Sequence, residues 1–436
     1  MQTLIRPTVA TTAGDEPVTA EPRVRTTWSP RTAFALVVIA QTLLLAASNF
    51  PTPLFPVYER QYGFGSGTVT LLFGVYVLVL IPSMLTLGRL TDRIGRRPVL
   101  TAGIAITALS SVAFAGARNL GWLFAGEIIY GIAAGMVMSA ASVAIRELHP
   151  SQNPAHGAWA TTLALATGLT AGPLLSGFLA TVTPWPTVSP YALDIAVAAL
   201  LAVALWRIPE TRPNVPAPAK RPPALHVPAS IRPAFIAAAL ASMTAWMATG
   251  WVFGLSPSFL HEQLHVHVTQ PVVAGLFAAL MVASNGVAQL TLRHVDGARS
   301  LRFALAGVVG GVALMASSTL NNSLAVALVG AVVTGFGAGV VQKSTMATVM
   351  TIAPAHARGG VTSAFFTGGY LAMSVPVVIA GLVADSAGGL GIVTALYLAA
   401  LAALTLIAVA AGVRAHRLAE APAVKCPREC ALSPAS

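Results

Sequence analysis

The chain has 436 residues, of which 56% are hydrophobic and only 9% are charged, and its mean hydropathy is +0.76. Soluble domains carry about 25% charged residues, and disordered chains are poor in apolar residues, so the composition excludes disorder and argues against a soluble protein. The net charge of +11 comes from basic residues in short loops between apolar runs. Without the basic, aromatic-interleaved patches of nucleic-acid binding proteins, no nucleic-acid partner is expected.

Residues 1–31 are polar and lack an apolar run of signal-peptide length, so we expect a disordered cytoplasmic tail. Twelve apolar segments follow, and runs near 20 residues that must satisfy their own backbone hydrogen bonds in lipid are membrane helices. The sequence thus predicts an all-α membrane protein. The segments are 32–57, 66–88, 98–117, 120–146, 157–182, 189–207, 233–260, 271–292, 302–320, 324–350, 359–384 and 390–413.

A stretch rich in proline and basic residues, 208–232, interrupts the helices after the sixth segment. Because proline-rich sequence cannot continue a helix, we expect a cytoplasmic linker between two six-helix bundles, 32–207 and 233–413. Residues 414–436 form a second polar tail, which contains both cysteines of the chain.

The distribution of basic residues predicts the orientation. The two tails and the loops on their side hold 22 of the 25 lysines and arginines, whereas the opposite side holds only Arg60 and Arg118. Under the positive-inside rule both termini are cytoplasmic. The abundance of arginine over lysine resembles GC-rich bacterial usage, so we expect a bacterial plasma membrane.

The two halves also resemble each other at an offset of 204 residues. Gly126, Gly131 and Gly135 fall on Gly330, Gly335 and Gly339, and Arg89 and Asp92 fall on Arg293 and Asp296. Parallel six-helix repeats place a site between the halves near the middle of the membrane. We therefore expect pseudo-symmetric bundles around one site.

Residues 88–97 read Gly-Arg-Leu-Thr-Asp-Arg-Ile-Gly-Arg-Arg between the second and third segments. The glycines permit close packing and a sharp turn, and the aspartate can accept hydrogen bonds from arginines or a helix start. This pattern resembles the signature loop of the major facilitator superfamily, which implies that Asp92 and Arg93 latch the halves in the outward-facing state. The alternative is that the arginines of this loop only fix the orientation of the chain in the membrane. The candidate latch comprises Gly88, Asp92, Arg93, Gly95, Arg96 and Arg97.

The segment 120–146 carries Glu127, where the same family often has an arginine associated with proton transfer. A carboxyl group in a membrane helix is costly and usually faces a cavity, and low dielectric favours its protonated form. We expect Glu127 to carry a proton; a counter-charge to a cationic substrate and a structural hydrogen bond are the alternatives. Asp194, near the start of segment 189–207, is either a second proton-coupling group or a favourable acid at a helix N-terminus.

The segment 157–182 contains Gly168-Leu-Thr-Ala-Gly172-Pro173-Leu-Leu-Ser-Gly177. Small residues four apart let helices approach closely, and proline bends a helix, so ordinary packing is one interpretation. The pattern also resembles the motif of the superfamily's proton-coupled antiporters, chiefly drug exporters. That resemblance favours export over uptake by symport.

Further polar and aromatic side chains in the segments are candidates for the lining of a substrate cavity, although interhelical hydrogen bonds or positions at the lipid interface explain any one of them equally well. Lys343 is also expected to reach towards the cytoplasmic interface. The candidates are Gln41, Asn49, Tyr130, Trp246, Trp251, Asn285, Gln289, Gln342, Lys343 and Tyr370.

His261-Glu-Gln-Leu-His265 matches the H-E-x-x-H pattern of zinc peptidases. It falls at the outer end of a membrane segment with no soluble domain around it, so a membrane metallopeptidase is a remote alternative and no metal or cofactor is expected. No phosphate-binding loop of an ATPase occurs. The sequence therefore predicts a monomeric secondary transporter rather than an enzyme, one that exports small hydrophobic or amphipathic molecules in exchange for protons.

Overall fold

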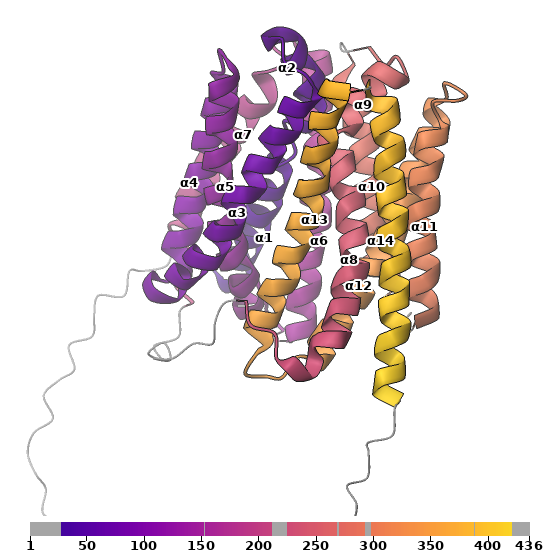
Figure 1. The fold of residues 1–436 in the computed structure, drawn as a ribbon. Helices are drawn as coiled ribbons and strands as arrows, with labels where there is room; N and C mark the ends of the chain where they lie inside the picture. The colour runs from indigo at the N-terminus through magenta and orange to yellow at the C-terminus, as the bar shows by residue number, and fades with distance from the viewer. Residues whose placement is uncertain are drawn as a thin grey trace, which may run out of the picture.

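The computed structural model describes residues 28–151, 153–211, 225–267, 270–292, 298–387 and 389–420, and these form helices joined by short turns (Figure 1). Eleven helical stretches of the described chain are long and apolar enough to cross a membrane, and the 17-residue α7 is a shorter apolar helix. About 17 residues is the lower limit for a span. The helices of the first half are α1 (Pro30–Ala47), α2 (Phe55–Tyr62), α3 (Ser66–Ile94), α4 (Arg96–Ala115), α5 (Leu120–Leu148), α6 (Pro154–Val182) and α7 (Ser189–Leu205).

The second half repeats this order after a 3-10 turn at Ala229–Ile231. The 204-residue offset places α5 on α12 with the same bounds and α6 on α13 to within one residue. Its helices are α8 (Arg232–Gly254), α9 (Ser256–Gln263), α10 (Pro271–Thr291), α11 (Ala298–Ser317), α12 (Leu324–Ile352), α13 (Arg358–Ala387) and α14 (Gly389–Glu420).

Two predicted segments are each broken near one end by prolines. The first ends at Ala47 rather than at 57, and the short α2 follows a 3-10 turn that begins after Pro51. The segment 233–260 divides at Leu255, because Pro257 in the first turn of α9 has no backbone N–H to continue α8. Both short helices lie together at one end of the molecule, opposite the end where α1 begins and α14 finishes (Figure 1). We call this the α2–α9 end and the other the tail end.

Each half has its own apolar core. One cluster joins α1, α3, α4, α5 and α7 and also takes in Tyr370 and Met373 of α13, and a second joins α8, α10, α11, α12 and α14. Between the halves, α6 packs along α10 and α3 packs along α13. The repeat exchanges these two pairs, so the seam between the halves is itself pseudo-symmetric.

Candidate transport and coupling sites

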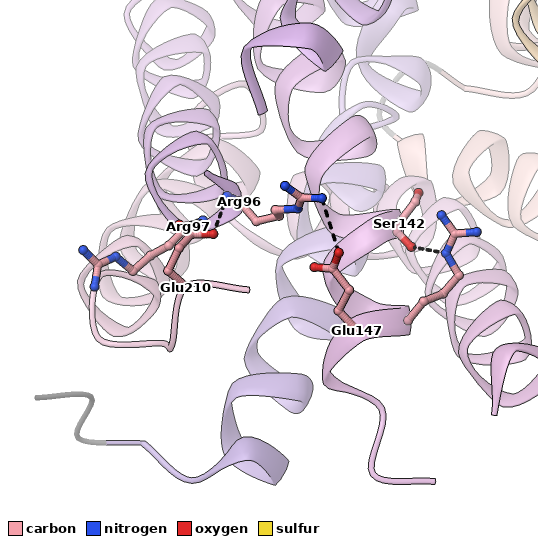
Figure 2. Close-up of polar contacts among 6 residues, drawn as sticks. Arg96, Arg97, Ser142, Glu147 and Glu210 are labelled. Atoms are coloured by element: carbon pink, nitrogen blue, oxygen red, sulfur yellow. Dashed lines mark hydrogen bonds and ion pairs between the residues drawn. The ribbon is translucent and has the colours of Figure 1, made fainter. Parts of the chain in front are cut away.

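The predicted latch loop is a one-residue turn. α3 continues to Ile94 and α4 starts at Arg96, with Gly95 alone between them at a φ of +101°. The carboxylate of Glu210 accepts hydrogen bonds from the backbone N–H groups of Arg96 (2.8 Å) and Arg97 (3.1 Å), as Figure 2 shows. An acid at a helix N-terminus is favourable, and its approach leaves no room for a side chain at Gly95.

The arginine side chains of this turn contact the first half. Arg96 is buried and pairs with Glu147 at the end of α5, with 3.3 Å between Nη2 and Oε1 (Figure 2). The guanidinium of Arg97 lies 5.5 Å from the ring centre of Trp206. The turn therefore ties α4 to α5 and to the chain that leaves α7.

The remaining latch residues lie in the last two turns of α3. Arg93 is exposed at the end of α3, and Gly88 faces Ser139 of α5. The side chain of Asp92 lies outside the described ones, as do residues 293–297, the counterpart of the loop in the second half.

The glycine–proline motif of α6 lies where three helices meet. Gly168 and Gly172 lie against the backbone of α1 at Thr42 and Ala46, and Gly177 lies against Pro271 at the start of α10. On the facing helix, Gly275 lies against the carbonyl oxygen of Pro173. Small residues allow this close approach, so the motif joins the first half to the second.

Glu127 is buried in α5, with 6% of its surface exposed. Within the described ranges, no hydrogen bond or ion pair joins Glu127 to another residue. A buried carboxyl group without a compensating cation is suited to carrying a proton.

Asp194 lies deeper than expected. It is the sixth residue of α7, its exposed fraction is 1%, and its Oδ2 accepts a hydrogen bond from Ser111 of α4 at 2.7 Å. Its other oxygen, also buried, has no partner in the part of the chain that the structure describes. The interpretation as an acid at a helix start is wrong, because α7 begins at Ser189 and Asp194 lies inside the bundle.

The polar candidates of the second half form one network. Nε2 of Gln289 donates to Oδ1 of Asn285 at 2.7 Å, and both amides lie 3.4 Å from Oε1 of Gln342 on α12. Nζ of Lys343 donates to the carbonyl oxygen of Leu292 at 2.8 Å, where a cation stabilises the end of α10. The structure thus brings three of the predicted cavity residues together, whereas Lys343 binds the end of α10.

Aromatic side chains from both halves belong to one apolar cluster. Trp246 lies 4.9 Å from Tyr370, ring centre to ring centre, and the Tyr370 hydroxyl lies 3.9 Å from the sulfur of Met138 on α5. Tyr130 packs on Tyr76, and its hydroxyl donates to the carbonyl oxygen of Leu44.

Three further candidates are placed in protein packing. Trp251 is fully buried against Phe259 within the core of the second half. Gln41 is buried in α1, and its Oε1 has no partner among the described residues. Asn49 follows α1 and donates to the Leu45 carbonyl oxygen at 3.2 Å.

Comparison with known proteins decides the family. The sequence profile of the Major Facilitator Superfamily matches residues 37–376. The chain belongs to the Major Facilitator Superfamily. It is therefore a multi-pass membrane transporter and not an enzyme, and the superfamily fold of two six-helix bundles accounts for the repeat.

Relatives of this superfamily transporter include resistance proteins. Multidrug resistance protein D of Escherichia coli is 28% identical over 175 residues, which cover 40% of this chain and 44% of that protein. Quinolone resistance protein NorA of Staphylococcus aureus is 28% identical over 141 residues, which cover 32% of this chain and 36% of that protein. The matches thus span less than half of each relative.

Solved structures share the fold over most of this chain. An inward-facing, unoccupied bacterial homologue of the lysosomal transporter Spinster aligns with a TM-score of 0.72 at 15% identity and covers 88% of this chain and 98% of that one. The human organic anion transporter MFSD10 aligns with a TM-score of 0.63 at 18% identity and covers 88% of this chain and all of that one.

The metallopeptidase alternative is wrong for this superfamily member. The geometry also argues against a zinc site, because α9 ends at Gln263 and His265, with a φ of +52°, lies beyond the helix. The H-E-x-x-H chemistry requires both histidines on one helix face, and His261 contacts the carbonyl oxygen of Val266 instead, at 2.9 Å.

Sequence reasoning missed Glu147 and Glu210. Glu210 fell in the predicted linker, where its only local signal is the Pro209-Glu210-Thr211 run directly after a helix. Its partners lie more than 110 positions earlier, and no spacing rule connects residues so far apart.

Proposed function

We propose that this transporter exports small hydrophobic or amphipathic compounds in exchange for protons across the bacterial plasma membrane. The two halves, residues 32–207 and 233–413, form a monomer that works by alternating access, with the tail end facing the cytoplasm. The observation that carries it is Glu127, a carboxyl group buried in a membrane-spanning helix with no cation paired to it in the described chain. Burying such a group in a membrane helix is costly, and ionisable residues in these positions usually serve a function.

In the proposed cycle, the outward-facing state takes up a proton on Glu127 from outside. Closing of the outer side and opening of the inner side then release this proton to the cytoplasm and admit the substrate. Asp194 is proposed as a second proton-coupling group, because one of its buried oxygens lacks a hydrogen-bond partner among the described residues.

The proposed substrate region is the middle of the seam. The pair Trp246 and Tyr370 of the second half and the pair Tyr76 and Tyr130 of the first belong to one apolar cluster. The amide network of Asn285, Gln289 and Gln342 supplies polar groups from α10 and α12. Aromatic walls with few polar groups suit amphipathic ligands.

Two comparisons support export. The α6 motif resembles that of the drug antiporters and lies on the seam between the halves, where it can act on closure. The relatives from E. coli and S. aureus carry drug-resistance names.

The test uses everted membrane vesicles and a panel of fluorescent hydrophobic dyes. An imposed proton gradient should drive dye uptake by the parent chain, and Glu127→Gln should abolish it. Glu262→Gln, an exposed carboxylate on α9, is the matched control and should transport normally. Full gradient-driven transport by Glu127→Gln would remove Glu127 from the mechanism. Dye accumulation in right-side-out vesicles instead would indicate uptake by symport.

A further inference from the structure

Two helices on the seam begin without a side-chain cap of their own. The residue before α3 is Gly65, which has no side chain to act as an acceptor. The residue before α10 is Gln270, whose side chain accepts no hydrogen bond from the helix. Because the first N–H groups of a helix have no partner within it, these groups need an acceptor from elsewhere.

In both cases the acceptor comes from the opposite half. Oγ1 of Thr181, at the end of α6, accepts a hydrogen bond from the N–H of Val272, the second residue of α10, at 3.2 Å. Oδ2 of Asp385, at the end of α13, accepts one from the N–H of Gly67, the second residue of α3, at 3.0 Å.

These two caps are related by the internal repeat. Asp385 lies 204 residues after Thr181, at the offset that relates the two halves, and each acceptor is near the end of the corresponding helix. The glycines Gly177 and Gly381 are separated by the same offset, and each lies against the helix that is capped, at Pro271 and Thr70. Two independent contacts thus repeat one arrangement at the α2–α9 end.

We propose that Thr181 and Asp385 are paired cross-half caps that hold the α2–α9 end closed, and that this end opens to the outside only when both hydrogen bonds break. The proposal rests on the proposed function in requiring that the halves rock against each other and that the α2–α9 end faces the outside. Because the Asp385 cap is charge-assisted and the Thr181 cap is neutral, breaking the first should favour opening more.

A cysteine reporter on the seam reads this opening directly. Thr70 is fully buried and faces Gly381 across the seam, so Thr70→Cys should react with a membrane-impermeant maleimide only when the α2–α9 end is open to the outside. Cys426→Ser and Cys430→Ser first remove the two native cysteines. Arg60→Cys, at an exposed position of α2, reports insertion and amount in parallel.

The expected result, in cells expressing the full chain without added substrate, is faster labelling of Thr70→Cys in cap variants. Loss of a helix cap corresponds to about fivefold in an equilibrium, so Asp385→Ala should label about fivefold faster. Thr181→Val should show a smaller increase in the same direction, and the double variant should show the product of the two. Asp385→Asn keeps an oxygen acceptor and should fall between the parent and Asp385→Ala.

Two neighbours serve as matched controls. Thr183→Val and Ser386→Ala remove hydroxyl groups whose hydrogen bonds stay within their own half, so their labelling should equal that of the parent. The proposal is overturned if Thr70→Cys labels at the parental rate in both cap variants while Arg60→Cys labels normally. Because labelling needs no gradient and no substrate, it separates this proposal from proton-coupled export.

Discussion

The carboxylate of Glu210, where the chain leaves the first half, caps the helix that begins at Arg96, 114 residues earlier. This contact joins the signature turn of the superfamily to the start of the linker between the halves. A displacement of Glu210 would therefore act on the same turn that carries Arg96 and Arg97.

Replacement of Glu210 should destabilise the first half. Glu210→Ala removes both acceptors from the start of α4, and a lost cap typically costs about 0.5–2 kcal/mol. Glu210→Gln keeps one acceptor oxygen and should lose less. The free energy of unfolding, measured by denaturant titration in detergent, checks this. Equal stability of the parent and Glu210→Ala would contradict the capping role.

Gly95→Ala should be harmful at the same turn for a different reason. At a φ of +101° an L-amino acid is strained, and the carboxylate of Glu210 occupies the space for a side chain. We expect a loss of about 1–3 kcal/mol in stability.

The matched control for Gly95 is Gly310→Ala in α11, where the added methyl group meets open space. Alanine favours a helix interior over glycine by about 1 kcal/mol, so this variant should be as stable as the parent or more so. A Gly95→Ala protein as stable as Gly310→Ala would show that the turn tolerates a side chain.

Gly177→Val should impair transport by acting on the seam between α6 and α10. A Cβ atom on Gly177 would lie 2.7 Å from the carbonyl oxygen of Pro271, so the larger side chain holds the two helices apart. We expect at least a tenfold loss of dye export in everted vesicles with normal amounts of protein in the membrane. Gly412→Val in α14, which meets no neighbouring atom, should export at the parental rate, and equal export by both variants would refute the packing role.

The long apolar runs and the repeat were sufficient to predict the membrane-spanning helices, because each span must satisfy its own backbone hydrogen bonds in lipid. They could not predict the breaks at Leu255 and after Ala47, since proline is tolerated near the start of a helix and inside α3 and α6 alike. The cross-half contacts of Asp385 and Gly67 depend on how the halves dock. Nothing in the local sequence of either residue encodes that docking.

The depth of Asp194 shows the same limit and leads to the last prediction. From the sequence it stood near a helix start, yet it is buried and bonded to Ser111 of α4. Asp194→Asn preserves the size of the side chain and an oxygen acceptor for Ser111 but cannot release a proton. If Asp194 carries a coupled proton, this variant should be present at normal levels while substrate-driven proton movement, followed with a pH-sensitive dye in vesicles, falls at least tenfold.

The companion variant separates coupling from structure. Ser111→Ala removes the hydrogen bond to Asp194 but leaves its carboxyl group able to titrate, so proton movement should persist while stability falls by about 1–3 kcal/mol through the unpaired buried oxygen. The reverse pattern, with normal proton movement in Asp194→Asn and reduced stability in both variants, would make Asp194 a structural residue. Glu127 would then be the remaining proposed carrier in the first half.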